Sequence, residues 1–201
     1  MTTQEKNGIT EGVIWKQLLI FFFPILVGSF FQQLYNTVDS VIVGQFVGKE
    51  ALSSVGGSAG QIISLVVGFF TGVSTGATVI ISQYFGAGKK EEIEESLHTA
   101  YAFALVGGLV LGIAGIVFAP QMLLWMNTPE ELIAESVLYV RVYFSGLIFI
   151  FIYNMGAAIL RAVGDSKRPL YYLIVCSVVN IILDLLLILV IPLGVLGAAI
   201  A

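Results

Sequence analysis

The sequence predicts an all-α fold, a polytopic membrane helix bundle with five complete transmembrane helices and the start of a sixth. Of its 201 residues, 58% are hydrophobic and only 11% carry charged side chains, whereas about a quarter of the residues in a soluble domain are charged. The mean hydropathy is +0.98. Long apolar stretches alternate with short segments that hold most of the charges, which excludes a soluble protein. The small net charge of −4 gives no sign of nucleic acid as a partner, and none is expected.

The first predicted helix covers residues 15–47. Because about 20 apolar residues suffice to cross a membrane, this helix can span while tilted. The polar segment 1–14 precedes it. The apolar run is too long for the core of a signal peptide, and no cleavage site of small residues follows it, so we expect the helix to be retained. Pro24 lies near its start, where a proline can introduce a kink.

The second predicted helix covers residues 59–85, after a short turn at residues 48–50. Two stripes of residues run along it. Small residues recur every four positions and predict the close approach of a neighbouring helix: Gly60, Ser64, Gly68, Gly72 and Gly76. Hydroxyl residues form the other stripe: Thr71, Thr75, Thr78 and Ser82. These hydroxyl groups either line a cavity or donate hydrogen bonds to carbonyl groups of their own helix.

Three further spans follow. The third helix covers residues 96–119 and ends at Pro120. It repeats the pattern of small residues: Ala100, Ala104, Gly108 and Gly112. A short surface helix is predicted to start at Thr128, because Pro129 and two glutamates suit a helix N-terminus. The fourth span covers residues 136–162, and the fifth covers residues 169–191.

Residues 193–201 match the opening of a sixth helix, after Pro192 and Gly194 interrupt the apolar pattern. This helix is cut off within its first turns. We therefore expect the chain to be a fragment of a longer protein, with residues 15–201 forming one membrane domain.

Lysine and arginine are unevenly divided between the two ends of the predicted helices. One end, which includes the N-terminal segment, holds seven: Lys6, Lys16, Lys89, Lys90, Arg161, Lys167 and Arg168. The other end holds two, Lys49 and Arg141. Because positively charged residues collect on the cytoplasmic side of a membrane protein, we expect the N-terminus and the segment 1–14 to be cytoplasmic.

Asp39 is the only charged residue between Lys16 and Lys49, inside the first predicted helix. An ionisable group at that depth costs at least a few kcal/mol, so it indicates a functional site that faces water or the interior of the bundle. Asn36 and Gln32 precede it by about one and two turns and share its helical face. We expect both to line a cavity.

Asp184 is the only other carboxylate predicted within the membrane, and Asn180 precedes it on the same helical face. Asp184 lies about 22 Å beyond Pro169, and Asp39 about 34 Å beyond Lys16, which places both in the outer half of the bilayer. Together with Asn180 they suit a hard cation such as Na⁺, or an exchangeable proton on a desolvated acid. The alternative is that each acid bonds separately to backbone or other polar groups. No cofactor is expected beyond a coupling H⁺ or Na⁺.

Four features occur in the order in which they occur in a known family: LYNTVDSVIVGQFVGKEALSSVG at 34–56, ISQYFGAGKKEE at 81–92, LRAVGDSKRPL at 160–170, and the pair Asn180 and Asp184. On these features the sequence resembles the bacterial multidrug and toxic compound extrusion (MATE) transporters over essentially its whole length. The resemblance implies twelve helices in two six-helix lobes around a central cavity, with this chain as the N-terminal lobe. It also implies that Asp39, Asn180 and Asp184 form the cation site of this lobe, joined by a hydroxyl residue of the sixth helix.

The resemblance further implies an antiporter of the plasma membrane that exports organic cations and other xenobiotics, driven by an H⁺ or Na⁺ gradient. Such a transporter rocks between outward- and inward-facing states. Its expected partners are small-molecule substrates, the lipid bilayer and the C-terminal lobe of the same protein. Two alternatives stay open: a half-transporter without transport activity, and a flippase of lipid-linked saccharides from the same superfamily. The flippases have arginine-rich cavities, and only Arg141 is a candidate for a spanning arginine here.

An enzyme is not expected. The chain has one histidine, His98, and one cysteine, Cys176. No cluster of residues suits a nucleophile, a base or a catalytic metal. A purely structural membrane protein would have no use for Asp39 and Asp184.

Overall fold

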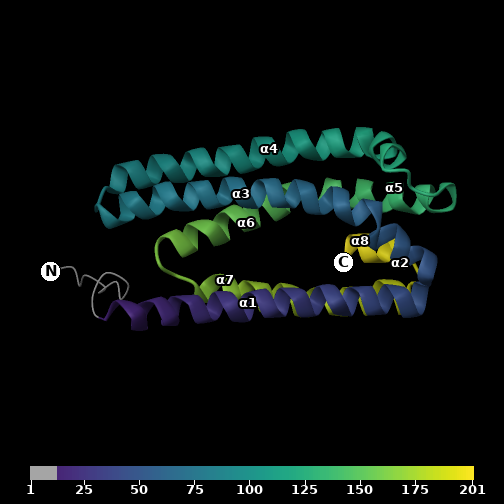
Figure 1. The fold of residues 1–201 in the computed structure, drawn as a ribbon, viewed down its shortest axis with the longest axis horizontal. Coiled ribbons are helices and arrows are strands. Elements are labelled where there is room, and N and C mark those ends of the chain that lie inside the picture. The colour runs from purple at the N-terminus through teal and green to yellow at the C-terminus, as the bar shows by residue number, and fades with distance from the viewer. Residues whose placement is uncertain (1–12) are drawn as a thin grey trace.

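The structure, a computed structural model, describes residues 13–201 as a bundle of helices along one long axis (Figure 1). These residues contain no β-strand. Four helices among them are long and apolar enough to cross a membrane, or five if the bent pair Glu130–Ser145 and Leu147–Ala162 counts as one span. The predicted all-α membrane fold is therefore confirmed. The predicted segment 1–14 lies outside the described residues, except for its last two.

The described residues form ten helical elements: α1 (Ile14–Ile42), the π-helical η1 (Val43–Val47), α2 (Lys49–Gly56), α3 (Ser58–Gly86), α4 (Lys90–Trp125), α5 (Glu130–Ser145), α6 (Leu147–Ala162), α7 (Lys167–Asp184), the π-helical η2 (Leu185–Val190) and α8 (Val195–Ile200). The predicted helices 15–47, 59–85, 169–191 and 193–201 correspond to α1 with η1, α3, α7 with η2, and α8.

The connections between helices gather at two ends of the bundle (Figure 1). The start of α1, the turn from α3 to α4 and the connection from α6 to α7 lie at one end, which we call the N-terminal end. Helices α2 and α8 and the connection from α4 to α5 lie at the other, which we call the α2 end.

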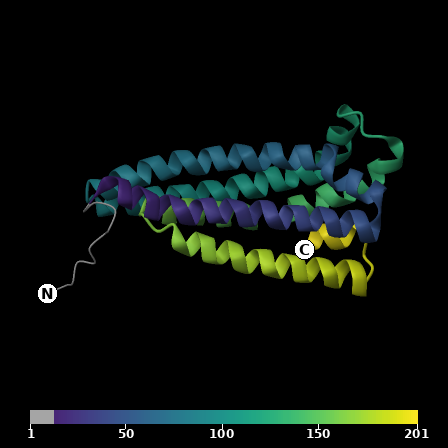
Figure 2. The same cartoon turned by 60° about the horizontal axis from the view of Figure 1, so that its bottom comes forward.

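Two apolar cores hold the helices together. The larger core lies among α3, α4, α5 and α6, and its fully buried side chains include Leu123, Val140, Leu147 and Phe151. Helix α1 packs instead against α7 (Figure 2). A smaller core at the α2 end joins this pair to the other helices: Ile42, Val43, Ala51, Ile188 and Val195.

The small residues of α4 let α5 and α6 approach closely. A Cβ atom added to Gly108 would lie 2.9 Å from Cα of Ile148, and one added to Gly112 would lie 3.0 Å from the carbonyl oxygen of Phe144. At Gly115 the added atom would overlap the ring of Phe144. The predicted close packing along this helix is therefore confirmed.

The same prediction for α3 is wrong at Gly68, Gly72 and Gly76, because a Cβ atom added to any of them would meet no atom within 4 Å. Large residues of α3, such as Phe70 and Ile81, are buried instead. Packing of these bulky side chains decides which face of α3 meets the neighbouring helices. A row of small residues permits close approach without requiring it.

Helix α4 is longer than the predicted helix 96–119. It begins at Lys90, with two glutamates in its first turn that interact favourably with the helix N-terminus. It then continues through Pro120 to Trp125, although the sequence predicts that Pro120 ends it. A proline removes only one backbone hydrogen bond in a helix. Leu123, buried in the larger core, holds the turns beyond it in place.

The predicted fourth helix, 136–162, is instead two helices, α5 and α6, which meet at Gly146 with a bend of 50°. Helix α5 begins at Glu130, so the short surface helix predicted from Thr128 is not a separate element. Glycine is a weak helix former, and the bend keeps both helices in contact with the larger core.

A short helix, α2, lies where the sequence predicts only a turn at residues 48–50. Gly48 has a φ angle of +126°, which residues with a side chain rarely adopt, and it separates η1 from α2. In α2, Ser54 is fully buried, and its carbonyl oxygen accepts a hydrogen bond from Ser136 Oγ of α5 at 3.2 Å. Helix α2 therefore closes this end of the bundle and links α1 to α5.

Candidate functional site

Asp39 and Asp184 meet because their helices pack side by side. Asp39 lies in the last turn of α1, and Asp184 is the last residue of α7. The Asp39 side chain is within hydrogen-bonding reach of the Asp184 carboxyl group and of the Asn180 side chain. Asp184 is only 1% exposed. The structure therefore brings the three residues singled out in the sequence into one enclosed cluster, which we call the acidic site.

The acidic site has more hydrogen-bond acceptors than donors. Three oxygen atoms are buried and accept no hydrogen bond: Asp39 Oδ1, Asn180 Oδ1 and Asp184 Oδ2. A buried oxygen without a donor is costly, and two adjacent carboxylates cannot easily both stay ionised in a poorly solvated place. A proton shared by the acids, or a hard cation bound between them, would satisfy these atoms.

The donor set of the acidic site suits Na⁺ or H⁺ better than a transition metal. In residues 13–201, no three His, Cys, Asp or Glu side chains gather in a group that could hold a metal ion. A cation here would rest on two carboxylates and one amide, all of them oxygen ligands. Hard cations prefer such ligands.

A π-helical segment follows each acidic residue. Segment η1 begins four residues after Asp39, and η2 begins directly after Asp184. In η1, the N–H group of Gly48 donates to the carbonyl oxygen of Val43 at 3.0 Å, with the five-residue spacing of a π-helix. Such turns often occur at functional sites. Here they change the winding of both helices beside the acids.

Tyr139 of α5 lies beside the acidic site, although no pattern in the sequence singles it out. It lies close enough to Asp39 and Asp184 to interact electrostatically with both, and its ring packs against both apolar cores. A phenol can donate a hydrogen bond to a carboxylate. The one sequence feature that could have pointed to Tyr139 is that Tyr143 follows it by one helical turn. The ring centroids of these two tyrosines lie 6.3 Å apart.

Gln32 and Asn36 share the face of α1 that carries Asp39, but they line neither of the two cavities described below. Both residues are exposed in the described part of the chain. The Gln32 side chain is hydrogen-bonded to Tyr35, and Ser40 Oγ donates to the Asn36 carbonyl oxygen at 2.9 Å. They form an open polar strip that leads along α1 to Asp39.

Thr71, Thr75 and Thr78 line a cavity of about 380 Å³ between α1, α3 and α6, which we call the threonine cavity. Their hydroxyl groups donate to carbonyl oxygens of α3 at 2.9, 2.8 and 2.9 Å. These threonines thus lie beside a cavity and are also hydrogen-bonded within their own helix. Thr78 Oγ1 lies 3.3 Å from the Ala158 carbonyl oxygen of α6 as well, and each hydroxyl oxygen keeps lone pairs for a ligand.

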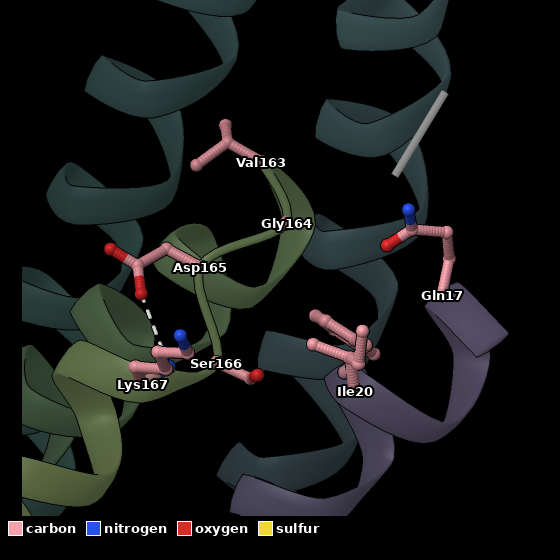
Figure 3. Close-up of a pocket in the computed structure, with 8 residues that line it drawn as sticks. Gln17, Ile20, Val163, Gly164, Asp165, Ser166 and Lys167 are labelled. Carbon is pink, nitrogen blue, oxygen red and sulfur yellow. Dashed lines mark hydrogen bonds between the residues drawn. The ribbon is translucent and has the colours of Figure 1, made fainter. Parts of the chain in front are cut away.

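A smaller cavity of about 230 Å³ lies at the N-terminal end, between α1 and the connection from α6 to α7. Figure 3 shows Gln17 and Ile20 of α1 across this cavity from Asp165. The Oδ1 atom of Asp165 accepts hydrogen bonds from the backbone N–H groups of Lys167 and Arg168, both at 3.1 Å. Asp165 therefore caps the start of α7, which is a structural role.

Comparison with known sequences places the chain in one family. The sequence matches the MatE family over residues 24–186. A probable multidrug resistance protein of Bacillus subtilis, YpnP, is 34% identical over 193 residues, which cover 94% of this chain and 42% of that protein. Another from the same species, YoeA, is 33% identical over 183 residues, which cover 91% of this chain and 39% of that protein. The chain spans about two-fifths of the length of these relatives.

Comparison with solved structures agrees with the sequence. The fold is similar to that of a multidrug resistance MATE transporter in an outward-facing conformation, with a TM-score of 0.91 and 26% sequence identity. The match covers 99% of this chain and 44% of that transporter. The residues that match the MatE family include Asp39, Asn180 and Asp184. The chain therefore belongs to the MatE family of multidrug and toxic compound extrusion transporters, and its fold is that of their N-terminal lobe.

Proposed function

We propose that this chain is the N-terminal lobe of an antiporter that exports organic cations and other xenobiotics in exchange for H⁺ or Na⁺. Membership of a multidrug transporter family supports the export of small molecules rather than an enzymatic activity. The main support for the exchange mechanism is the acidic site. There Asp39, Asn180 and Asp184 lie together, and each has one buried oxygen atom without a hydrogen-bond partner.

In this mechanism the acidic site holds the coupling ion. A proton shared by Asp39 and Asp184, or a Na⁺ ion between them, keeps α1 and α7 together. When the ion leaves, two negative charges face each other in a poorly solvated place, and their repulsion separates the helices. A hydroxyl residue of the sixth helix, as the family resemblance implies, would complete the site.

Helices α1 and α7 are placed to carry this change to the substrate. Because α1 packs mainly on α7 rather than on α3 to α6, the pair can shift relative to those helices. An ion shifts the equilibrium between two arrangements of these helices only if it binds one arrangement more tightly than the other. The substrate is exported when it favours the arrangement that lacks the ion.

The proposed setting is the plasma membrane, with the lipid bilayer and a C-terminal lobe of the same protein as partners and the N-terminus in the cytoplasm. The orientation rests on the excess of Lys and Arg at the N-terminal end. It can be checked by labelling Lys89→Cys on a Cys176→Ser background with an impermeant thiol reagent. Labelling in intact cells would contradict the orientation, and labelling of Lys49→Cys, at the α2 end, is the positive control.

Asp39→Asn in the full-length transporter tests the proposed function. The substitution is nearly isosteric and removes a charge that needs a partner, so the protein should still fold and reach the membrane. Efflux of a fluorescent organic cation under an imposed H⁺ or Na⁺ gradient should fall to the level of vesicles without the transporter. Glu50→Gln, which alters an exposed carboxylate at the same end of the bundle, is the control and should transport normally. Normal efflux by Asp39→Asn would overturn the mechanism.

A further inference from the structure

The threonine cavity contains a positive charge without a counter-charge. Arg161, in the last turn of α6, lines it and is partly buried. The two ion pairs among the described residues are Lys89 with Glu92 and Arg168 with Asp165, so neither involves Arg161. No carboxylate lines the cavity. A partly desolvated guanidinium is costly unless it is paired, so the cavity favours a ligand with a negative charge.

Ser74 is a second unsatisfied group in the same cavity. It lies on α3 and is only 4% exposed. Its Oγ atom is buried and has no hydrogen-bond partner, although the residue lines the cavity. Buried hydroxyl groups are nearly always hydrogen-bonded. A buried hydroxyl without a partner, in a residue that lines a cavity, would gain a hydrogen bond from a polar ligand or bound water there once its side chain turned toward the cavity.

The other polar groups of the cavity offer acceptors. Asn154 Nδ2 donates to the Ile150 carbonyl oxygen at 2.8 Å, which leaves the amide oxygen of Asn154 for a ligand. Thr71 and Thr75 use their protons within α3 and keep their lone pairs. A ligand that fits must combine one anionic group with several hydrogen-bond donors.

We propose that the threonine cavity binds a phosphate ester of a polyol, with the phosphate on Arg161 and the hydroxyl groups on Ser74, Thr75 and Asn154. A guanidinium binds phosphate through paired, charge-assisted hydrogen bonds. The volume of about 380 Å³ is more than an inorganic anion alone would fill. Besides Arg161, the cavity offers hydrogen-bond acceptors, and the hydroxyl groups of a polyol can donate to them.

The shape and place of the cavity allow two sources of this ligand. Its lining on α3 extends from Thr71 to Ser82, about 16 Å along the helix, and Arg161 lies where α6 ends at the N-terminal end of the bundle. The ligand is therefore either a soluble polyol phosphate or the headgroup of a glycerol-headed phospholipid.

Phe21, which lines the cavity, lies about 27 Å from Asp39 along α1. The site is thus separate from the acidic site, and the inference does not rest on the proposed function.

Thermal unfolding of the purified full-length transporter tests the site. The probes are glycerol 3-phosphate and detergent micelles that contain phosphatidylglycerol. Glycerol, which lacks phosphate, and phosphatidylcholine, which lacks headgroup hydroxyls, are the controls. We expect at least one probe to raise Tm saturably: glycerol 3-phosphate if the ligand is soluble, phosphatidylglycerol if it is a lipid headgroup. If neither raises Tm beyond its control, the proposal is wrong.

Single substitutions locate the binding. Arg161→Gln should weaken the apparent affinity about ten- to a hundredfold, as expected for the loss of charged hydrogen bonds, and Ser74→Ala about three- to tenfold. Removal of an unpaired charge should not lower Tm of the ligand-free protein. Arg168→Gln, at an exposed arginine already paired with Asp165, is the matched control and should bind normally. Unchanged affinity in Arg161→Gln would overturn the proposal.

Discussion

The two acids of the site lie within hydrogen-bonding reach of each other. Asp184 is almost completely enclosed, and the Asp39 side chain is within hydrogen-bonding reach of Asp184 and Asn180. One proton or one cation would serve both carboxylates at once. Such a pair titrates as a unit rather than as two independent groups.

Non-additive losses should therefore appear when both acids are changed. Asp39→Asn and Asp184→Asn should each abolish gradient-driven efflux by the full-length transporter, and the double variant should be little worse than either single variant. Asn180→Ala removes one neutral ligand and should reduce efflux less severely. The efflux of a fluorescent organic cation from proteoliposomes is measured for all four variants. If the loss in the double variant equals the product of the two single losses, the acids act independently.

Single residues differ in how far the sequence reveals them. Asp39 and Asp184 can be predicted, because isolated carboxylates in apolar helices are costly and a common depth suggests that they meet. Tyr139 and Ser74 cannot, because hydroxyl residues are frequent in membrane helices and usually bond to their own backbone. Only the packing of α3, α5 and α6 shows that Tyr139 lies beside two acids and that Ser74 lines a cavity with its hydroxyl group unpaired.

Among the helices, α3 and α4 carry similar rows of small residues with different consequences. Gly108 of α4 faces the backbone of α6 at Ile148, whereas Gly72 of α3 faces open space. The sequence cannot separate the two cases, because the pattern of small residues is the same. What separates them is the position of bulky neighbours such as Phe70 and Phe151, which fill the larger core.

Matched substitutions in these two helices should have opposite effects on stability. Gly108→Ala should destabilise the full-length transporter by about 1–3 kcal/mol, because the new Cβ atom would lie 2.9 Å from backbone that cannot easily move. Gly72→Ala should be neutral, or stabilising by up to about 1 kcal/mol, since alanine is the better helix former and has room. Thermal unfolding of the purified protein measures both. Equal Tm values for the two variants would contradict the packing of α4 on α6.

Helix limits are a second property that the sequence predicts only in part. Pro120 is predicted to end the third helix and residues 136–162 are predicted to form one span, yet α4 runs through the proline and the fourth span bends at Gly146. The free energy that decides these cases comes from contacts with the larger core. Those contacts involve residues far apart in the chain, so no local pattern contains them.

Over the whole molecule, the helices fall into two packing groups. Helices α3 to α6 share the larger core, and α1 and α7 form a pair joined to them by the smaller core at the α2 end. The acidic site lies within this pair, near the π-helical segments η1 and η2. The threonine cavity lies between α1 and the other group. This arrangement suits a movement in which α1 and α7 respond together to an ion.

The number of spans and the family could be predicted from apolar length and from motifs, but the packing partners could not. In a soluble helix the buried face is the apolar face, whereas here the exposed residues are apolar as well. Phe149 is 73% exposed and Phe151 is 1% exposed, although both are phenylalanines two positions apart in α6. Periodicity of hydrophobic residues therefore does not reveal that α7, rather than α3, lies against α1.

Ion release on substrate binding shows whether Asp39 and Asp184 hold the coupling ion. An organic cation is added to the purified full-length transporter, in a weakly buffered solution with a pH indicator or after loading with radioactive Na⁺. We expect release of H⁺ or Na⁺ from the unmodified protein and from the control Glu50→Gln, and none from Asp39→Asn or Asp184→Asn. Undiminished release from Asp39→Asn, with substrate still bound, would show that another group holds the coupling ion.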